Sequence, residues 1–284
     1  MVTGRPGGLV RALVVASHFP PTVMVTAFAL ALSAGIGAGA RTTTLVALAV
    51  LAGQLSVGWC NDWLDARRDL AVGRADKPVV AGLVTPGVLR AAAFVALGAC
   101  VVLSFATGVV PGAVHVVAVA SAWSYNAVLK ATWWSWAPYA LSFGLLAVFV
   151  VLAAPGGGRP APWAVAAAAL LGVGAHVANT LPDLEDDAAT GVRGLPHRLG
   201  RRASTVLAPV LLGAASVLVV LAPPGPPGPA GWALGAVAVV LAVAAGGSGV
   251  ARPRSRAPFA LSMAVAGVCV VLLVLAAPAV VLAG

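Results

Sequence analysis

Acidic residues are scarce in this 284-residue chain: there are eight, against 17 lysines and arginines, for a formal net charge of +9. Charged residues of both signs make up only 9% of the sequence, whereas hydrophobic residues make up 61%. A water-soluble domain with so few charges would expose a largely apolar surface, so a soluble fold is excluded. The mean hydropathy of +1.01 leads to the same expectation, an integral membrane protein.

Cysteine is also rare, and its positions exclude a cysteine-based metal site. Cys60, Cys100 and Cys269 lie in separate apolar segments, and we interpret them as reduced packing residues. The four histidines are scattered without metal-ligand spacing, so we interpret them as packing or interface residues. In a membrane protein the excess of cations is first explained by the membrane surface, so no nucleic-acid partner is expected.

Long apolar runs predict the fold. They have the length of about 20 residues that a helix needs to cross the bilayer core, and they lack the alternation of barrel strands. We therefore expect a single all-α domain, a polytopic membrane bundle around a central cavity. Divided at charge and Pro/Gly clusters, the sequence gives nine expected spans: 20–40, 42–60, 86–108, 112–129, 137–153, 162–181, 204–222, 230–248 and 258–282.

The cations alternate with these spans in a way that predicts orientation. The segments before the first span and after the second, fourth, sixth and eighth spans carry 15 of the 17 lysines and arginines. Only Arg41 and Arg159 fall on the opposite side. Because short loops rich in Lys and Arg stay in the cytoplasm, we expect a multi-pass cell-membrane protein whose N-terminus is cytoplasmic.

The acidic residues are concentrated in two short stretches, 61–69 and 179–187, with only Asp76 outside them. The stretches follow the second and sixth spans, and both begin with asparagine. This pattern predicts a parallel four-helix internal repeat with a ninth helix added, which would place the stretches opposite each other on the cytoplasmic side. If each stretch is helical, two sets share a face at three- and four-residue spacing: Asp62, Asp65 and Asp69, and Asn179, Asp183 and Asp187.

Carboxylates stacked in this way repel one another, so a cation is expected between them. Their oxygens suit Mg²⁺, which takes one or two protein carboxylates and completes its shell with water and phosphate oxygens. Two such sets facing one cavity would bridge metal ions to a diphosphate. The alternative is that the acidic residues only form a solvated loop after each span. It is disfavoured because acidic residues that line membrane cavities are normally functional.

Cations and a third polar group accompany the acids. Arg74 and Lys77 follow the first stretch and Arg193 follows the second, where they would neutralise a diphosphate leaving group. Arg90, Arg201 and Arg202 are better explained as anchors at the level of the lipid headgroups. A third polar group lies at the end of the fourth span: Tyr125, Asn126 and Lys130. These side chains could equally well contact substrate or form hydrogen bonds between helices.

These residues, in this order, resemble the UbiA superfamily of intramembrane prenyltransferases. The motif Asn-Asp-x-x-Asp-x-x-x-Asp is matched in full at 61–69 and is followed by R-A-D-K-P-V-V-A-G at 74–82. The second motif, Asp-x-x-x-Asp, is matched at Asp183 and Asp187, and residues 191–200 are similar to the family's G-K-R-T-L-P-x-x-L-G. Ser17-His18-Phe19-Pro20 replaces a common Arg-Pro pair, and Val192 and Gly194 replace Lys and Thr, which suggests a specialised branch.

The resemblance implies a prenyl diphosphate substrate, Mg²⁺ as cofactor, and a lipophilic acceptor, above all an aromatic one. The allylic cation would be protected from water in an apolar cavity that opens to membrane lipid. The implied roles are metal binding and catalysis by Asp62, Asp65, Asp183 and Asp187, support of the metal shell by Asn61, Asp69, Asn179 and Asp186, and neutralisation of the leaving group by Arg74, Lys77, Lys130 and Arg193.

Two other functions remain open at this point. A UbiA-type terpene cyclase would use the same ionising site without an external acceptor, and the altered His18 region is compatible with it. A divalent-cation transporter is disfavoured, because it would place ionisable residues along the bilayer midplane rather than towards one face. The sequence does not indicate the prenyl length, the acceptor or the oligomeric state.

Overall fold

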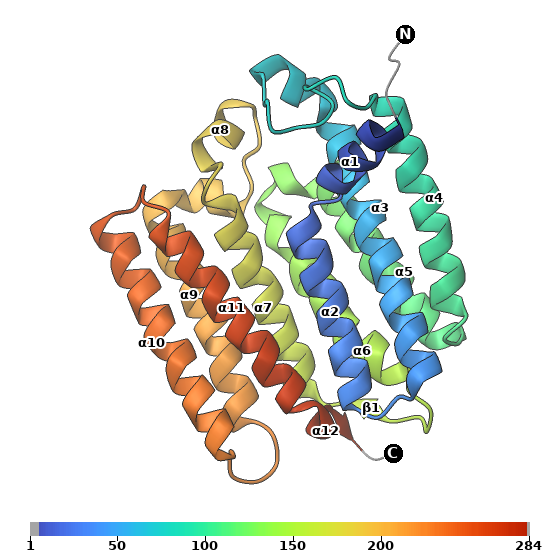
Figure 1. The fold of residues 1–284 in the computed structure, drawn as a ribbon. Helices are drawn as coiled ribbons and strands as arrows, with labels where there is room; N and C mark the ends of the chain where they lie inside the picture. The colour runs from blue at the N-terminus through green and yellow to red at the C-terminus, as the bar shows by residue number, and fades with distance from the viewer. Residues whose placement is uncertain (1–5, 283–284) are drawn as a thin grey trace.

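The computed structural model describes residues 6–282 and consists almost wholly of helices (Figure 1). The long helices run alternately up and down, and two short strands pair antiparallel near the C-terminus. The elements are α1 Pro6–Ala16, α2 Phe19–Gly35, α3 Ala40–Val72, α4 Pro86–Phe105, α5 Val109–Ala127, η1 Leu129–Ala131, η2 Trp133–Trp136, α6 Ala137–Ala153, β1 Arg159–Pro160, α7 Pro162–Thr180, α8 Leu184–Ala189, α9 Leu195–Leu221, α10 Pro229–Ala251, α11 Ala257–Leu275, α12 Ala277–Val280 and β2 Val281–Leu282.

The all-helical membrane fold is confirmed, and a long helix lies at each of the nine expected positions. Seven of the described helices are long and apolar enough to cross a membrane individually, or eight when α1 and α2, bent by 67°, count as one broken span. The remaining helix, α5, carries His115, Tyr125 and Asn126, which lower its hydropathy. The count of nine spans is therefore close but not confirmed.

Close backbone contacts bring the helices together. Gly172 of α7 lies against α6, where an added Cβ would meet the Tyr139 carbonyl oxygen at 2.5 Å. Gly58 of α3 lies against the backbone of Ser17 at the α1–α2 break, where a Cβ would meet the carbonyl oxygen at 2.8 Å. Small residues permit such contacts between membrane helices, which gain stability from packing rather than from a hydrophobic driving force.

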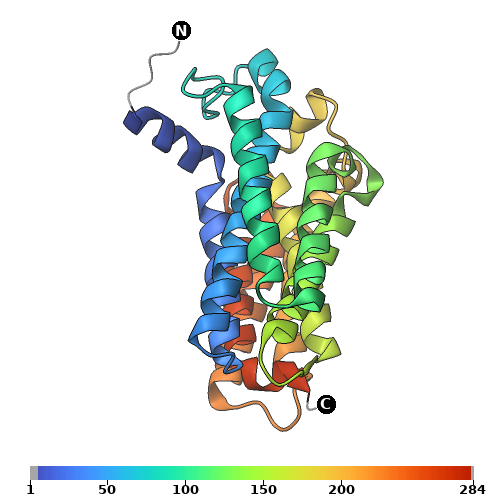
Figure 2. The same ribbon diagram turned by 90° about the vertical axis from the view of Figure 1, so that its right-hand side faces the viewer.

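The helices form a closed bundle in sequence order. Each long helix packs against the next, and α11 returns to contact both α2 and α7 (Figures 1 and 2). The main core lies between these helices and includes Phe149, Leu32 and Leu212, all fully buried. The first acidic stretch lies within the last part of α3 and the second begins at the end of α7, and both helices run towards the same end of the bundle. The four-helix repeat itself remains a prediction.

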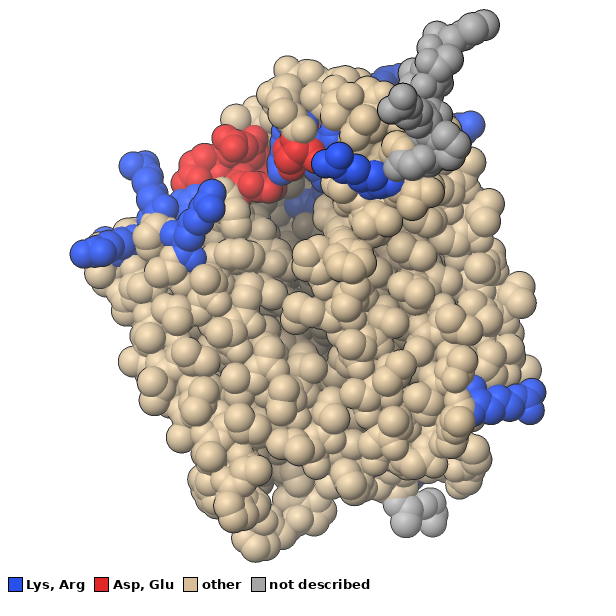
Figure 3. Space-filling model, in the orientation of Figure 1, with Lys and Arg blue, Asp and Glu red and all other residues tan. Residues whose placement is uncertain are grey.

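One end of the bundle carries nearly all the charge. In Figure 3 the visible acidic residues and most visible lysines and arginines gather along one edge of the molecule. Arg41 lies in the first turn of α3 and Arg159 in β1, both at the opposite end from the acidic stretches, as the charge pattern predicts. This separation is the arrangement on which the predicted orientation depends. Which end faces the cytoplasm remains a prediction.

Candidate active site

The first acidic stretch lies within a continuous helix. The predicted second span, 42–60, is part of a longer helix, because α3 continues to Val72 and ends at Gly73 in a left-handed conformation. Its 33 residues correspond to about 50 Å, longer than a bilayer core of about 30 Å, so the acidic end extends beyond the apolar part. The expected shared face is confirmed for Asp62, Asp65 and Asp69, which are only 2%, 7% and 3% exposed.

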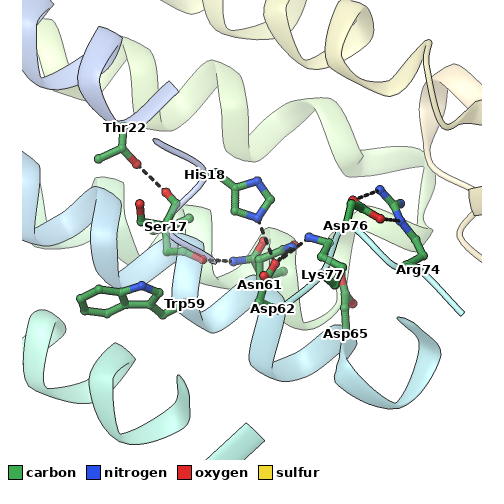
Figure 4. A network of polar contacts seen from close by, with 12 residues as sticks. Ser17, His18, Thr22, Trp59, Asn61, Asp62, Asp65, Arg74, Asp76 and Lys77 are labelled. Carbon is green, nitrogen blue, oxygen red and sulfur yellow. Dashed lines mark hydrogen bonds and ion pairs between the residues drawn. The ribbon is translucent and has the colours of Figure 1, made fainter. Parts of the chain in front are cut away.

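Asp62 is held by two side chains from outside its helix (Figure 4). Lys77 Nζ donates to Asp62 Oδ1 at 2.7 Å, and His18 Nε2 lies 3.0 Å from the same oxygen. His18 occupies the break between α1 and α2 with φ of 53°, an uncommon conformation for a residue other than glycine. Such strain costs about 1–3 kcal/mol and concentrates at functional sites.

Asp65 is held by cations from two elements. Arg68 Nη2, one turn along α3, donates to Asp65 Oδ2 at 2.9 Å. Lys130 Nζ, from η1, donates to the other carboxylate oxygen, Oδ1. Buried carboxylates need such partners, because an unpaired buried charge is very costly. The Lys130 segment and the first acidic stretch are thus brought together, although they are far apart in the sequence.

The second stretch is built differently. Helix α7 ends at Thr180, and Asp183 precedes the short helix α8, Leu184–Ala189. The expectation that Asn179, Asp183 and Asp187 share one face of a single helix is therefore wrong. Pro182 gives the physical reason, because proline lacks the backbone N–H needed to continue a helix and its ring clashes with the preceding turn.

Arg74 links the loop after the first stretch to the second stretch. From the loop that follows α3, Arg74 Nη1 donates to Asp183 Oδ2 at 3.3 Å. Its Nε and Nη2 donate to the two carboxylate oxygens of Asp76 at 3.3 and 3.1 Å. The hydrogen bonds with Asp76 raise the pKa of Arg74 and lower the pKa of Asp76. The guanidinium therefore stays charged beside the second stretch.

Asp187 packs against the start of α9. Burial raises the pKa of Asp187, but the nearby His197 ring and the charges of Arg68 and Arg74 lower it by more, so the net pKa lies below the ordinary value. His197 Nε2 is 3.7 Å from Asp187 Oδ2. The carboxylate thus stays ionised at neutral pH, as an oxygen ligand for a metal must be.

The loop between α8 and α9 is fixed from the opposite side of the site by Ser135. Ser135 Oγ accepts a hydrogen bond from the Leu195 backbone N–H at 2.8 Å and lies 3.1 Å from His176 Nε2. Gly194 makes this contact possible, since an added Cβ would lie 2.7 Å from Ser135 Oγ. The departure from the family pattern at Gly194 therefore has a structural explanation in this chain.

Both stretches line one cavity of about 290 Å³. Nine of the predicted site residues line it: Asn61, Asp65, Asp69, Arg74, Lys77, Tyr125, Lys130, Asp183 and Asp187. Four other lining residues were absent from the predicted site: His18, Arg68, Asp76 and Val192. Arg68 and Asp76 lie within or beside the first motif, so their position in the sequence was an available signal. The sequence singled out His18 only as part of a departure from the family pattern, and its contact with Asp62 depends on the bend between two helices.

Five predicted site residues do not line this cavity. Asp62 is not among the residues that line the cavity. Asn126 Nδ2 donates to the Val57 carbonyl oxygen at 2.9 Å, which is the helix–helix hydrogen bond that the sequence allowed as an alternative to substrate contact. Asn179, Asp186 and Arg193 are exposed. Tyr125 does line the cavity, and its ring stands edge-on to the rings of Tyr139 and His176.

The donor set fits a hard divalent cation. Among residues 6–282, no three His, Cys, Asp or Glu side chains already converge in metal-binding geometry, because lysine and arginine groups hold the carboxylates instead. Mg²⁺ does not need such a cage, since it usually binds one or two carboxylates together with water and phosphate oxygens. All carboxylates of both stretches are oxygen donors, so the residues present suit Mg²⁺ bound together with a phosphate-bearing substrate.

Two known proteins are similar to this chain in sequence. The bacteriochlorophyll synthase 33 kDa chain of Cereibacter sphaeroides is 34% identical over 202 residues, which cover 66% of this chain and 65% of that protein. The digeranylgeranylglyceryl phosphate synthase of Methanopyrus kandleri is 32% identical over 196 residues, covering 66% of this chain and 68% of that protein. The chain thus matches about two thirds of the length of each relative.

Solved structures share the fold. A UbiA homolog from Archaeoglobus fulgidus bound to GPP and Mg²⁺ has a TM-score of 0.69 at 14% identity, covering 95% of this chain and 99% of that chain. A UbiA homolog from Aeropyrum pernix K1 has a TM-score of 0.68 at 18% identity, covering 88% of this chain and 97% of that chain. The model of the UbiA prenyltransferase family matches residues 22–268, a range that contains both acidic stretches. With that match over most of its length, the chain belongs to the UbiA prenyltransferase family.

Proposed function

We propose that this protein is a Mg²⁺-dependent intramembrane prenyltransferase, which ionises a prenyl diphosphate and transfers the prenyl group to an aromatic or other lipophilic acceptor. One observation carries the proposal: both acidic stretches line a single cavity, where Arg74, from the loop after the first stretch, donates to Asp183 of the second. The relatives named as synthases and the structure bound to GPP and Mg²⁺ support the same substrate class.

The metal would be held by four aspartates. Asp62 uses Oδ1 for its contacts with Lys77 and His18, and no described residue donates to its Oδ2. When bound, Mg²⁺ supplies positive charge that stabilises the departing diphosphate. The proposed ligands are Asp62, Asp65, Asp183 and Asp187, supported by Asn61, Asp69, Asn179 and Asp186.

The cations of the site would change partners when substrate binds. Lys77, Lys130 and Arg74 now neutralise aspartates at the edge of the cavity. With metal on the aspartates, these groups are free to donate to diphosphate oxygens, which gain negative charge as the prenyl–oxygen bond breaks. Arg193, on the exposed α8–α9 loop, would complete this set from the outer side.

The rest of the bundle would protect the prenyl cation. The side chains beyond the polar cavity form the apolar core, which excludes water that would otherwise capture the cation. Tyr125 lies at the boundary, with its ring packed against two other aromatic rings. The acceptor carbon would attack from this apolar side, and the prenyl tail would enter between helices from membrane lipid.

The orientation follows from the charge distribution. Every cation of the described residues except Arg41 and Arg159 belongs to the end that carries the acidic stretches. By the positive-inside rule we place that end, with the active site and the N-terminus, at the cytoplasmic face of a cell membrane. Reaction of a membrane-impermeant thiol reagent with single cysteines placed at Arg67 and Arg159 in sealed cells tests this placement.

A turnover assay with the purified protein tests the function. With Mg²⁺, a prenyl diphosphate and a panel of aromatic lipid acceptors, we expect diphosphate release coupled to a prenylated acceptor. EDTA should lower turnover by at least about 100-fold, and added Mg²⁺ should restore it. Undiminished turnover in EDTA would refute the metal role. Efficient formation of a hydrocarbon or terpene alcohol without acceptor would refute the transferase and favour the cyclase.

A further inference from the structure

A second hollow, of about 450 Å³, opens beside α8 at the same end of the bundle as the active site. It lies between α8, the start of α9 and the connection from α10 to α11. In Figure 3, groups of lysine and arginine side chains stand next to the acidic residues on this side. The lining residues are Glu185, Arg201, Arg202, Arg252, Pro253, Arg254 and Ser255, none of which lines the active-site cavity. We call this the arginine hollow.

The charge of the arginine hollow is largely uncompensated. Its one acid, Glu185, is held at both carboxylate oxygens by Arg201, with Nε donating to Oε1 at 2.7 Å. Across residues 6–282, no carboxylate lies within ion-pair distance of Arg202, Arg252 or Arg254. Three of the arginines that line the hollow therefore have no carboxylate partner among the described residues and can donate to an anion.

The position of the hollow indicates what kind of anion it would meet. It lies where α10 ends and α11 begins, at the end of two helices apolar enough to cross a membrane. Towards the bilayer, α10 exposes apolar side chains, among them Val250 at 52% and Val243 at 70%. α10 is also the least buried of the candidate spans, so one side of it lies against lipid.

We propose that the arginine hollow binds the phosphate of an anionic membrane lipid, whose acyl chains lie along the exposed side of α10. Guanidinium groups bind phosphate oxygens through paired hydrogen bonds, and basic pockets at helix ends on a membrane face select anionic headgroups. Separate topology anchors need no common pocket, whereas these four arginines converge on one. Because Arg201 also holds α8, a lipid at this site would contact the element that carries the second acidic stretch.

Lipid binding to the delipidated full-length protein in detergent tests the proposal, with native mass spectrometry as the readout. The probes are dioleoyl-phosphatidylglycerol, dioleoyl-phosphatidylcholine and inorganic phosphate. We expect wild-type protein to bind phosphatidylglycerol more tightly than phosphatidylcholine. The double variant Arg252→Gln/Arg254→Gln should weaken phosphatidylglycerol binding about 30-fold, at about fivefold for each cation lost near the membrane surface. Arg41→Gln/Arg159→Gln, with two exposed arginines at the opposite end, is the matched control and should leave it unchanged.

Two results would overturn the proposal. Equal phosphatidylglycerol binding by wild type and Arg252→Gln/Arg254→Gln would show that the hollow is not the site. Displacement of the lipid by inorganic phosphate at equal concentration would assign the hollow to a free phosphate ion instead. Both arginines lie in an exposed connection, so the variant is expected to fold, and an unchanged melting temperature checks this. Because binding is measured without substrate, the result does not depend on the proposed enzymatic activity.

Discussion

The two acidic stretches do the same chemical task in the proposed site, yet they are built in opposite ways. The first lies on one continuous helix, with its aspartates buried and paired with Lys77, Lys130, Arg68 and His18. The second is interrupted by Pro182, and the side chain of Asp183 is 44% exposed. The first stretch is therefore preorganised by the fold, whereas the second depends on contacts made by loops.

The largest effect should come from removing one carboxylate of either stretch. Asp65→Asn and Asp183→Asn should each lower prenyl diphosphate turnover by about 100- to 1000-fold, as expected when a group that stabilises the departing charge is lost. Their stabilities should differ, since Asp65→Asn leaves Lys130 and Arg68 without a counter-charge. We expect a loss of about 1–3 kcal/mol in the free energy of unfolding for Asp65→Asn and below about 1 kcal/mol for Asp183→Asn. Steady-state kinetics measures the turnover and thermal unfolding measures the stability. Equal losses of stability in the two variants would contradict the contrast between a preorganised first stretch and a loop-dependent second stretch.

A smaller effect should come from Arg74, which links the loop after the first stretch to Asp183 of the second. Arg74→Ala removes charge-assisted hydrogen bonds, each of about 1.5–3 kcal/mol, so KM for prenyl diphosphate should rise at least about tenfold. The matched control is Arg67→Ala on the same chain segment, since Arg67 is exposed and forms no ion pair among the described residues. The two variants should be compared by substrate titration. A rise in KM of equal size in both variants would mean that substrate binding depends on general positive charge and not on the specific contacts of Arg74.

The smallest effect should come from the support of the second stretch. Ser135→Ala deletes the acceptor for the Leu195 backbone N–H and the contact with His176, which should cost about 1–2 kcal/mol of stability. Turnover should fall by less than tenfold, because no carboxylate is removed. Ser142→Ala, which deletes a helix–helix hydrogen bond to Ala118, is a matched control for stability with no expected loss of turnover. Normal turnover in Ser135→Ala would show that the α8–α9 loop needs no such support.

The same contrast explains how far the sequence leads. The face shared by Asp62, Asp65 and Asp69 follows from helical periodicity alone, and the structure confirms it. The predicted second span, 42–60, covers the apolar part of α3, whereas the helix itself continues through the charged residues to Val72. In the fold, pairing with cations from other elements allows those residues to remain in a buried helix.

The second stretch shows what periodicity cannot decide. Its acids have helical spacing, but Pro182 lies among them and stops the helix, a local signal that outweighs the spacing. The contact between His18 and Asp62 joins residues 44 positions apart and depends on the bend of α1 against α2. Tertiary contacts of this kind are set by packing and leave no pattern in the sequence.

The central claim is that both stretches bind one diphosphate through shared metal ions, and a double-mutant cycle on ligand binding tests it most directly. The measurement is the affinity of a non-ionising prenyl diphosphate analogue, with Mg²⁺ present, for wild type, Asp65→Asn, Asp183→Asn and the double variant. If the stretches form one site, the double variant should bind little more weakly than the weaker single variant, because either loss already disrupts the shared site. Fold losses that multiply in the double variant would show two independent sites and contradict the account.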